Sequence, residues 1–120
     1  LRTRETAVPG TSGAVSLAGT AGMLAAAAAL ATLAAAVRLI PWAAVPVVAY
    51  AGACGALADT VVGAWLQARR WCPTCARATE QPVHRCGTST HADGGLAWLT
   101  NDRVNLICTL VGAAVALALQ

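Results

Sequence analysis

Two long apolar runs, at residues 14–37 and 39–58, constrain the fold of this chain more than any other feature. Each can cross the roughly 30 Å hydrocarbon core of a bilayer, which takes about 20 helical residues. A shorter run at residues 104–119 reaches that length only if residues 96–100 contribute. Of the 120 residues, 58% are hydrophobic and 11% are charged, which is atypical of soluble domains. The sequence predicts an all-α, polytopic membrane protein with three transmembrane helices.

Turn-forming residues set the expected helix boundaries within a single membrane domain over residues 1–120. Turn-forming Pro, Gly and hydroxyl residues precede the first helix, and prolines separate it from the second. The following segment is polar, without an apolar period, and we interpret it as a loop. The expected elements are helices at about 12–37, 45–67 and 98–119, with the polar loop at 68–95.

All eight basic residues are arginines, and seven of them lie in the amino-terminal segment or between the second and third apolar runs. Only Arg38 lies in the other connection. Positive charge is retained on the cytoplasmic side, so we expect the amino end and the Cys/His loop to be cytoplasmic. There is no basic and aromatic pattern that indicates nucleic-acid binding.

Alanine and glycine dominate the apolar runs, which gives three helices little bulk for a self-sufficient bundle. The chain also begins at Leu1 rather than at methionine. We therefore expect a fragment of a larger helical bundle, surrounded by membrane lipids and completed by missing amino-terminal helices or a second subunit.

Small and polar residues line one face of the second expected helix at spacings of three and four. They are Gly52, Gly55, Asp59, Gly63 and Gln67. A carboxylate in a membrane helix indicates a functional site, while the glycines allow a partner helix or substrate to approach. The alternative is a structural Asp59 paired with an arginine or hydroxyl of a neighbouring helix.

A second polar stripe, Asn101, Asp102 and Asn105, opens the third expected helix. Asn101 or Asp102 can equally be helix caps, which leaves Asn105 unexplained. Helix amino ends bind anions, so the segment before the first helix is a candidate phosphate site with Gly10, Thr11, Ser12, Gly13 and Ser16. Together these groups suit a phosphate with Mg²⁺, with helix packing as the alternative.

The polar loop carries two pairs of metal-ligand residues, Cys72 with Cys75 and His84 with Cys86. Cys-x-x-Cys presents two sulfurs from one turn, and thiolates with imidazole bind Zn²⁺ tetrahedrally. A reducing cytoplasm disfavours disulfides. The loop therefore predicts a structural zinc site. The alternative is that the cysteines are incidental or have a redox role.

Four stretches resemble integral membrane family 92 of unknown function, also called the transmembrane protein 19 family. They are residues 8–16, 55–67, 72–87 and 98–105. The family includes the plant phytyl-phosphate kinase of vitamin E synthesis. Thr60 stands where members usually have serine after the aspartate, and the usual amino-terminal half, with its own Ala-Asp-Thr motif, is absent.

This resemblance implies nucleotide-dependent phosphorylation of an isoprenoid monophosphate, with Mg²⁺ and a nucleoside triphosphate as cofactors. It implies that Asp59 and Asp102 hold the metal, that Asn101 and Asn105 orient phosphates, and that residues 10–13 hold an anion. A membrane transporter or lipid-binding protein, and a non-catalytic assembly module, remain as alternatives.

Overall fold

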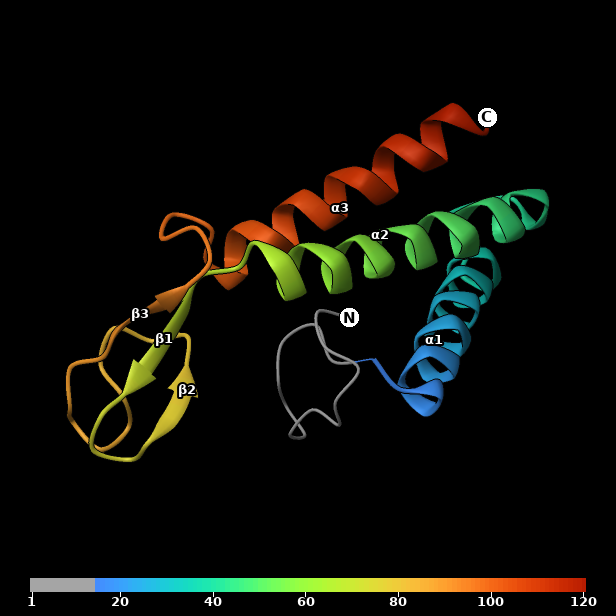
Figure 1. Cartoon of the computed structure of the whole chain (residues 1–120). Helices are drawn as coiled ribbons and strands as arrows, with labels where there is room; N and C mark the ends of the chain where they lie inside the picture. The colour runs from blue at the N-terminus through green and yellow to red at the C-terminus, as the bar shows by residue number, and fades with distance from the viewer. Residues whose placement is uncertain (1–14) are drawn as a thin grey trace.

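Three long helices and a small antiparallel sheet make up residues 15–120, the part of the chain that the computed structural model describes. The sheet lies at one end of the α2–α3 pair, and the turn from α1 to α2 lies at the other (Figure 1). In chain order the elements are α1 (Leu17–Ala36), the 3-10 turn η1 (Trp42–Ala44), α2 (Val45–Trp65), β1 (Arg69–Cys72), β2 (Arg77–Thr79), β3 (His91–Gly94) and α3 (Asn101–Ala118).

Local chemistry explains both ends of α1. The Ser16 side chain accepts a hydrogen bond from the Gly19 amide at 3.0 Å and so caps the first turn. At the other end Arg38 adopts a positive φ of 63°, and the Leu39 amide bonds back to the Ala34 carbonyl. This left-handed residue ends the helix and reverses the chain toward α2.

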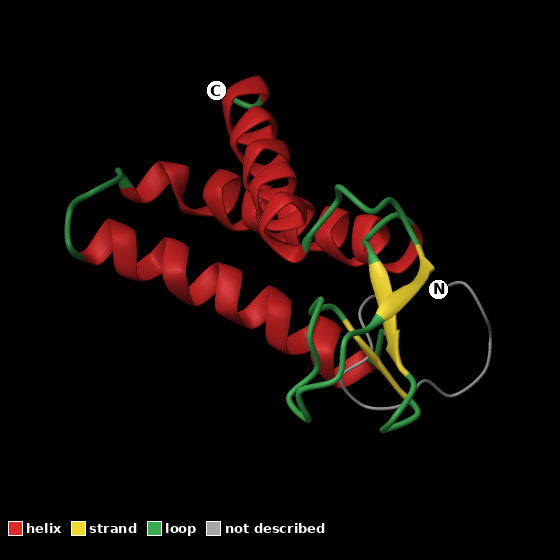
Figure 2. Ribbon diagram, turned by 90° about the vertical axis from the view of Figure 1, so that its left-hand side faces the viewer, coloured by secondary structure: helices red, strands yellow, loops and turns green. Residues whose placement is uncertain are grey.

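Helix α2 is central, because it packs against both α1 and α3 (Figure 2). A Cβ atom added at Gly55 would lie 2.8 Å from the Cys108 carbonyl oxygen of α3. One added at Gly112 would lie 3.2 Å from the Ala51 carbonyl oxygen of α2. Only glycine permits this backbone approach, which is the usual basis of helix association in lipid.

Between α2 and α3 the chain forms a three-stranded sheet in the order β2-β1-β3, with both pairings antiparallel. Strand β1 follows α2 almost directly, and β3 precedes α3. The Ala68 amide donates to the Leu99 carbonyl, and the Leu96 amide donates to the Leu66 carbonyl, both at 2.9 Å. These bonds join the end of α2 to the approach to α3.

Aromatic side chains mark two levels along the helices. Trp65 and Trp98 are exposed beside the sheet, and Trp42 is exposed at the opposite end of α2. The stretch Trp42–Trp65 has 24 residues, or about 36 Å at 1.5 Å per residue. Tryptophans at this separation match the two interfacial belts of a bilayer.

The predicted fold class is confirmed, since α1, α2 and α3 are each long and apolar enough to cross a membrane. Many large apolar side chains on them are exposed, as Leu30 and Leu110 illustrate. The sheet was not expected, because its strands of three or four residues carry no apolar alternation. Their pairing depends on partners distant in sequence, which periodicity does not reveal.

Replacing Gly55 by valine should destabilise the α2–α3 contact by about 1–3 kcal/mol, because a branched side chain overpacks a backbone oxygen. Thermal unfolding in detergent, followed by helical circular dichroism, measures the effect. Gly22→Val is the matched control, since nothing lies within 4 Å of a Cβ placed there. Equal melting temperatures for the two variants would contradict the assigned contact.

Candidate functional site

Cys72, Cys75, His84 and Cys86 converge in one cluster, and Cys72 is the last residue of β1, the strand that runs away from the helices (Figure 1). Each offers one ligand atom, and all four atoms lie within 4.8 Å of one another. Cys72 ends β1 and is fully buried, while Cys86 is exposed on the segment between β2 and β3. The predicted ligand residues are thus brought together, and the Cys/His cluster can bind a metal ion.

Two tight turns present these ligands. The residues directly after Cys75 and Cys86 have positive φ, 48° at Ala76 and 83° at Gly87. The Gly87 amide closes the second turn by donating to the His84 carbonyl at 2.8 Å. Left-handed backbone at these positions lets each short turn hold its cysteine toward the same point.

The ligand atoms of the cluster lie in close contact. The Cys72 and Cys86 sulfurs are 3.7 Å apart, and His84 Nδ1 lies 3.1 Å from the Cys86 sulfur. Hydrogen bonds with Thr88 and His84 lower the pKa of Cys86 to about 5. A hydrogen bond with Cys86 raises the pKa of Cys75 to about 11. The lowered pKa of Cys86 favours its thiolate, which is the form that binds metals.

Arg70 and Thr90 anchor the ligand-bearing segment to β1. The Arg70 guanidinium donates to the Thr90 hydroxyl at 2.7 Å and to the Thr90 carbonyl at 2.6 Å. The hydroxyl in turn lies 2.7 Å from the Gln81 carbonyl, to which it donates. Thr90 is buried, so this polar network is shielded from water. Neither residue was singled out from the sequence, because the 20-residue separation leaves no local pattern.

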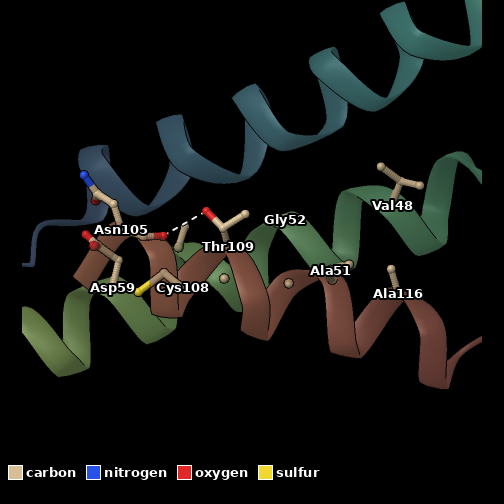
Figure 3. Close-up of a pocket in the computed structure, with 12 residues that line it drawn as sticks. Val48, Ala51, Gly52, Asp59, Asn105, Cys108, Thr109 and Ala116 are labelled. Carbon is tan, nitrogen blue, oxygen red and sulfur yellow. Dashed lines mark hydrogen bonds between the residues drawn. The ribbon is translucent and has the colours of Figure 1, made fainter. Parts of the chain in front are cut away.

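A second candidate site is a cleft of about 700 Å³ between α2 and α3. Asp59 and Asn105 lie at its end near the sheet, and Val48 and Ala116 lie at the opposite end (Figure 3). Thr109 lines the middle, with its hydroxyl bonded to the Asn105 carbonyl at 2.8 Å. The remaining lining residues are Ala51, Gly52, Gly55, Ala56, Cys108, Gly112 and Ala113. The carboxylate and the amide of this α2–α3 cleft lie at one end, and apart from Thr109 the rest of its lining is apolar.

The cleft gathers only part of the residues predicted from the two polar stripes. Asp59 and Asn105 line it together with Gly52 and Gly55. Gly63, on α2, and Gln67, two residues beyond the end of α2, are buried but are not lining residues. Asn101 and Asp102 are exposed in the first turn of α3 and also lie outside the lining.

Most of the predicted phosphate-binding segment lies outside residues 15–120, which the structure describes. Gly10, Thr11, Ser12 and Gly13 lie outside the described residues. Ser16 is described, and its hydroxyl oxygen is engaged as the cap of α1.

The three apolar helices and their polar connection define a multi-pass helical membrane protein. The chain matches the family described as integral membrane protein DUF92 over residues 1–113 and belongs to that family. The resemblance seen in the sequence is thereby confirmed. No curated protein and no solved structure matches the chain significantly.

Replacing Thr90 by valine should loosen the segment between β2 and β3, because the Arg70 guanidinium and the Gln81 carbonyl both lose a buried partner. A cost of about 1–3 kcal/mol raises the population of the open segment roughly 5- to 150-fold. Trypsin cleavage after the exposed Arg85 measures that opening. The control is Thr79→Val, since Thr79 accepts one exposed bond at 3.3 Å. Unchanged cleavage in Thr90→Val would refute the anchoring role.

Proposed function

We propose that the protein belongs to a membrane enzyme that transfers a phosphoryl group from a nucleoside triphosphate to an isoprenoid monophosphate such as phytyl phosphate. The observation that supports this most is the polarity of the α2–α3 cleft. Asp59 and Asn105 share one end, and the rest is lined by alanine, glycine and other small side chains. Such a cleft matches an amphiphile with a polar headgroup and a hydrocarbon chain.

The depth of Asp59 supports a headgroup site. Asp59 precedes Trp65 by six residues, which is about 9 Å along α2. Trp65 and Trp98 are exposed at the level where helices give way to the sheet, as expected for an interfacial belt. Since the headgroup region is about 5–8 Å thick, Asp59 lies just beneath it, at the edge of the hydrocarbon core. A phosphate attached to a membrane-embedded chain reaches this level.

The length of the cleft supports an extended chain. Val48 and Asp59 are 11 residues apart on α2, as are Asn105 and Ala116 on α3, so each lining covers about 16 Å. The two helices run in opposite directions along it (Figure 3). A hydrocarbon chain lying between them would point from the interface toward the bilayer centre.

The proposed site needs a cation, because the negatively charged Asp59 carboxylate would otherwise repel the substrate phosphate. Mg²⁺ is suited to one or two carboxylates completed by water and substrate phosphates, and it neutralises charge during phosphoryl transfer. Asp59 would supply one such ligand and Asn105 an amide to orient a phosphate oxygen. Asp102, in the first turn of α3, would supply a second metal ligand, and Asn101 would orient a phosphate of the nucleotide from the amino end of that helix.

The reaction forms a bond between a monophosphate oxygen and the γ-phosphorus of the nucleotide, while the bond to the β–γ bridging oxygen breaks. The products are an isoprenoid diphosphate and a nucleoside diphosphate. The protein's own contribution is to hold both phosphates in line at the membrane surface.

Replacing Asp59 by asparagine should reduce formation of phytyl diphosphate by about a hundredfold or more, because a metal ligand is lost. The assay supplies the protein in lipid with phytyl phosphate, Mg²⁺ and CTP or ATP, and quantifies the diphosphate by mass spectrometry. Asp93→Asn, at an exposed position of β3, is the control and should retain activity.

Two other outcomes would replace the proposal. Saturable binding or movement of phytyl phosphate without nucleotide consumption would favour a lipid-binding protein or transporter, in keeping with the mostly apolar lining. A loss of folded protein in Asp59→Asn, with unchanged activity per folded molecule, would favour an assembly module in which Asp59 is structural.

We also propose that the Cys/His cluster holds a structural Zn²⁺. Zn–S bonds of about 2.3 Å in a tetrahedron place two sulfurs about 3.8 Å apart. The Cys72 and Cys86 sulfurs are already 3.7 Å apart. The 3.1 Å from His84 Nδ1 to the Cys86 sulfur is shorter than the roughly 3.6 Å of a tetrahedral N–S edge. Three thiols and one imidazole complete four ligands, which leaves no open position for catalysis.

Arginine placement supports a cytoplasmic cluster. Arg69, Arg70, Arg77, Arg85 and Arg103 lie on the sheet side of the described helices, and Arg38 lies at the other end. The excess of positive charge favours the cytoplasm for the sheet. In that reducing compartment the cysteines stay available as ligands.

The purified protein should contain one zinc ion per chain, measured by elemental mass spectrometry after dialysis in reductant. Cys75→Ser should lose most of it, because a site with three ligands binds far more weakly. Cys54→Ser is the control, since Cys54 lies in α2 away from the cluster. Full occupancy in Cys75→Ser, or none in the unmodified protein, would exclude the proposed site.

A further inference from the structure

We infer that the metal centre is a clamp that holds the end of α2 against the start of α3, so that metal occupancy sets the geometry of the polar end of the α2–α3 cleft. This inference rests on the proposed metal site and is independent of phosphoryl transfer. It assigns the Cys/His cluster a role in the membrane part of the protein, although its ligands lie outside the helices.

The first step is the connection between cluster and sheet. Cys72 is the last residue of β1, and Cys75 lies in the turn to β2. His84 and Cys86 come from the long segment that returns to β3, and Arg70 ties the end of that segment to β1 through Thr90. A bound ion therefore joins the β1 end to the segment that leads into β3.

The second step is the weakness of the sheet alone. Its strands have four, three and four residues, and both edge strands are exposed except at the half-buried Thr79. Sheets this small are marginal in water without a hydrophobic face or another cross-link. The fully buried Cys72 is one of its few apolar anchors. Metal binding supplies the missing stability, as in other small metal-dependent units.

The third step is the contact between sheet and helices. β1 and β3 pair at Arg69 with Gly94, next to the helix ends. Gly95 has a φ of 74°, and a Cβ there would lie 1.9 Å from the Gln67 carbonyl oxygen, so the two backbones touch. The hydrogen bonds from Ala68 to Leu99 and from Leu96 to Leu66 extend this contact. The β1–β3 pair is thus continuous with the junction of α2 and α3.

The last step leads from the junction to the cleft. Leu99 is 1% exposed and packs with Val104 and Cys108 of α3. Ala58 and Val62 of α2 pack against the same cluster. Ala58 directly precedes Asp59, and Val104 directly precedes Asn105. Movement of Leu99 out of this cluster would therefore change how Asp59 and Asn105 face each other.

Amide hydrogen exchange of the protein in lipid nanodiscs tests the clamp. Removing zinc with a chelator should speed exchange about tenfold at Ala68 and Leu96, whose amides bridge the helix ends, and leave α1 unchanged. His84→Ala should reproduce this effect in the presence of zinc. His84→Cys should restore both zinc and protection, because four thiolates also bind Zn²⁺ tetrahedrally. His91→Ala, in exposed β3, is the matched control.

The possible outcomes distinguish a failure of the clamp from a failure of the proposed metal site or of the proposed phosphoryl transfer. Zinc-dependent exchange confined to residues 73–90, with Ala68 and Leu96 unaffected, would overturn the clamp while leaving the metal site intact. Lost protection in a fully zinc-loaded His84→Cys variant would also overturn it. Absence of zinc from the unmodified protein would defeat the metal site and the clamp together, whatever the phosphoryl-transfer assay shows.

Discussion

Close backbone contact between α2 and α3 is the constraint on which the rest of the structure depends. In lipid there is no hydrophobic force between helices, so association depends on packing and on polar contacts. Gly55 and Gly112 let each helix reach a carbonyl oxygen of the other. The same small residues leave a cleft beside the contact, and this cleft brings Asp59 and Asn105 to one end. Packing and the candidate site therefore have a common origin.

The sheet solves a second problem, which is how two closely packed membrane helices are joined across a 35-residue connection, residues 66–100. A long polar loop would leave the last carbonyls of α2 and the first amides of α3 to water. Here the chain returns along itself, and backbone bonds at Leu66 and Ala68 fix where α3 begins. Strand β1 runs away from the helices (Figure 1), so the turn that follows it and carries Cys75 lies at the end of the sheet distant from them.

The sequence was informative where the signal is local. Apolar runs revealed the helices, and Cys-x-x-Cys with a nearby His and Cys revealed the cluster. The sequence did not predict which residues of α3 face the cleft, because Asn101, Asp102 and Asn105 lie on nearly the same stripe of the helix. Only the rotation of α3 against α2 shows that Asn105 lines the cleft and that the other two do not. The sheet and the Arg70–Thr90 anchor depend on long-range pairing, which leaves no period in the chain.

The depth of the cleft bears on how an acidic residue is accommodated in α2. A carboxylate at the bilayer centre costs several kcal/mol, but that cost falls toward the interface. Asp59 lies about 9 Å below Trp65, within reach of headgroups and water through an open cleft. Its position beside Asn105, about 9 Å from Trp65 along α2 and next to the junction of α2 and α3, is what the proposed binding of a polar headgroup requires.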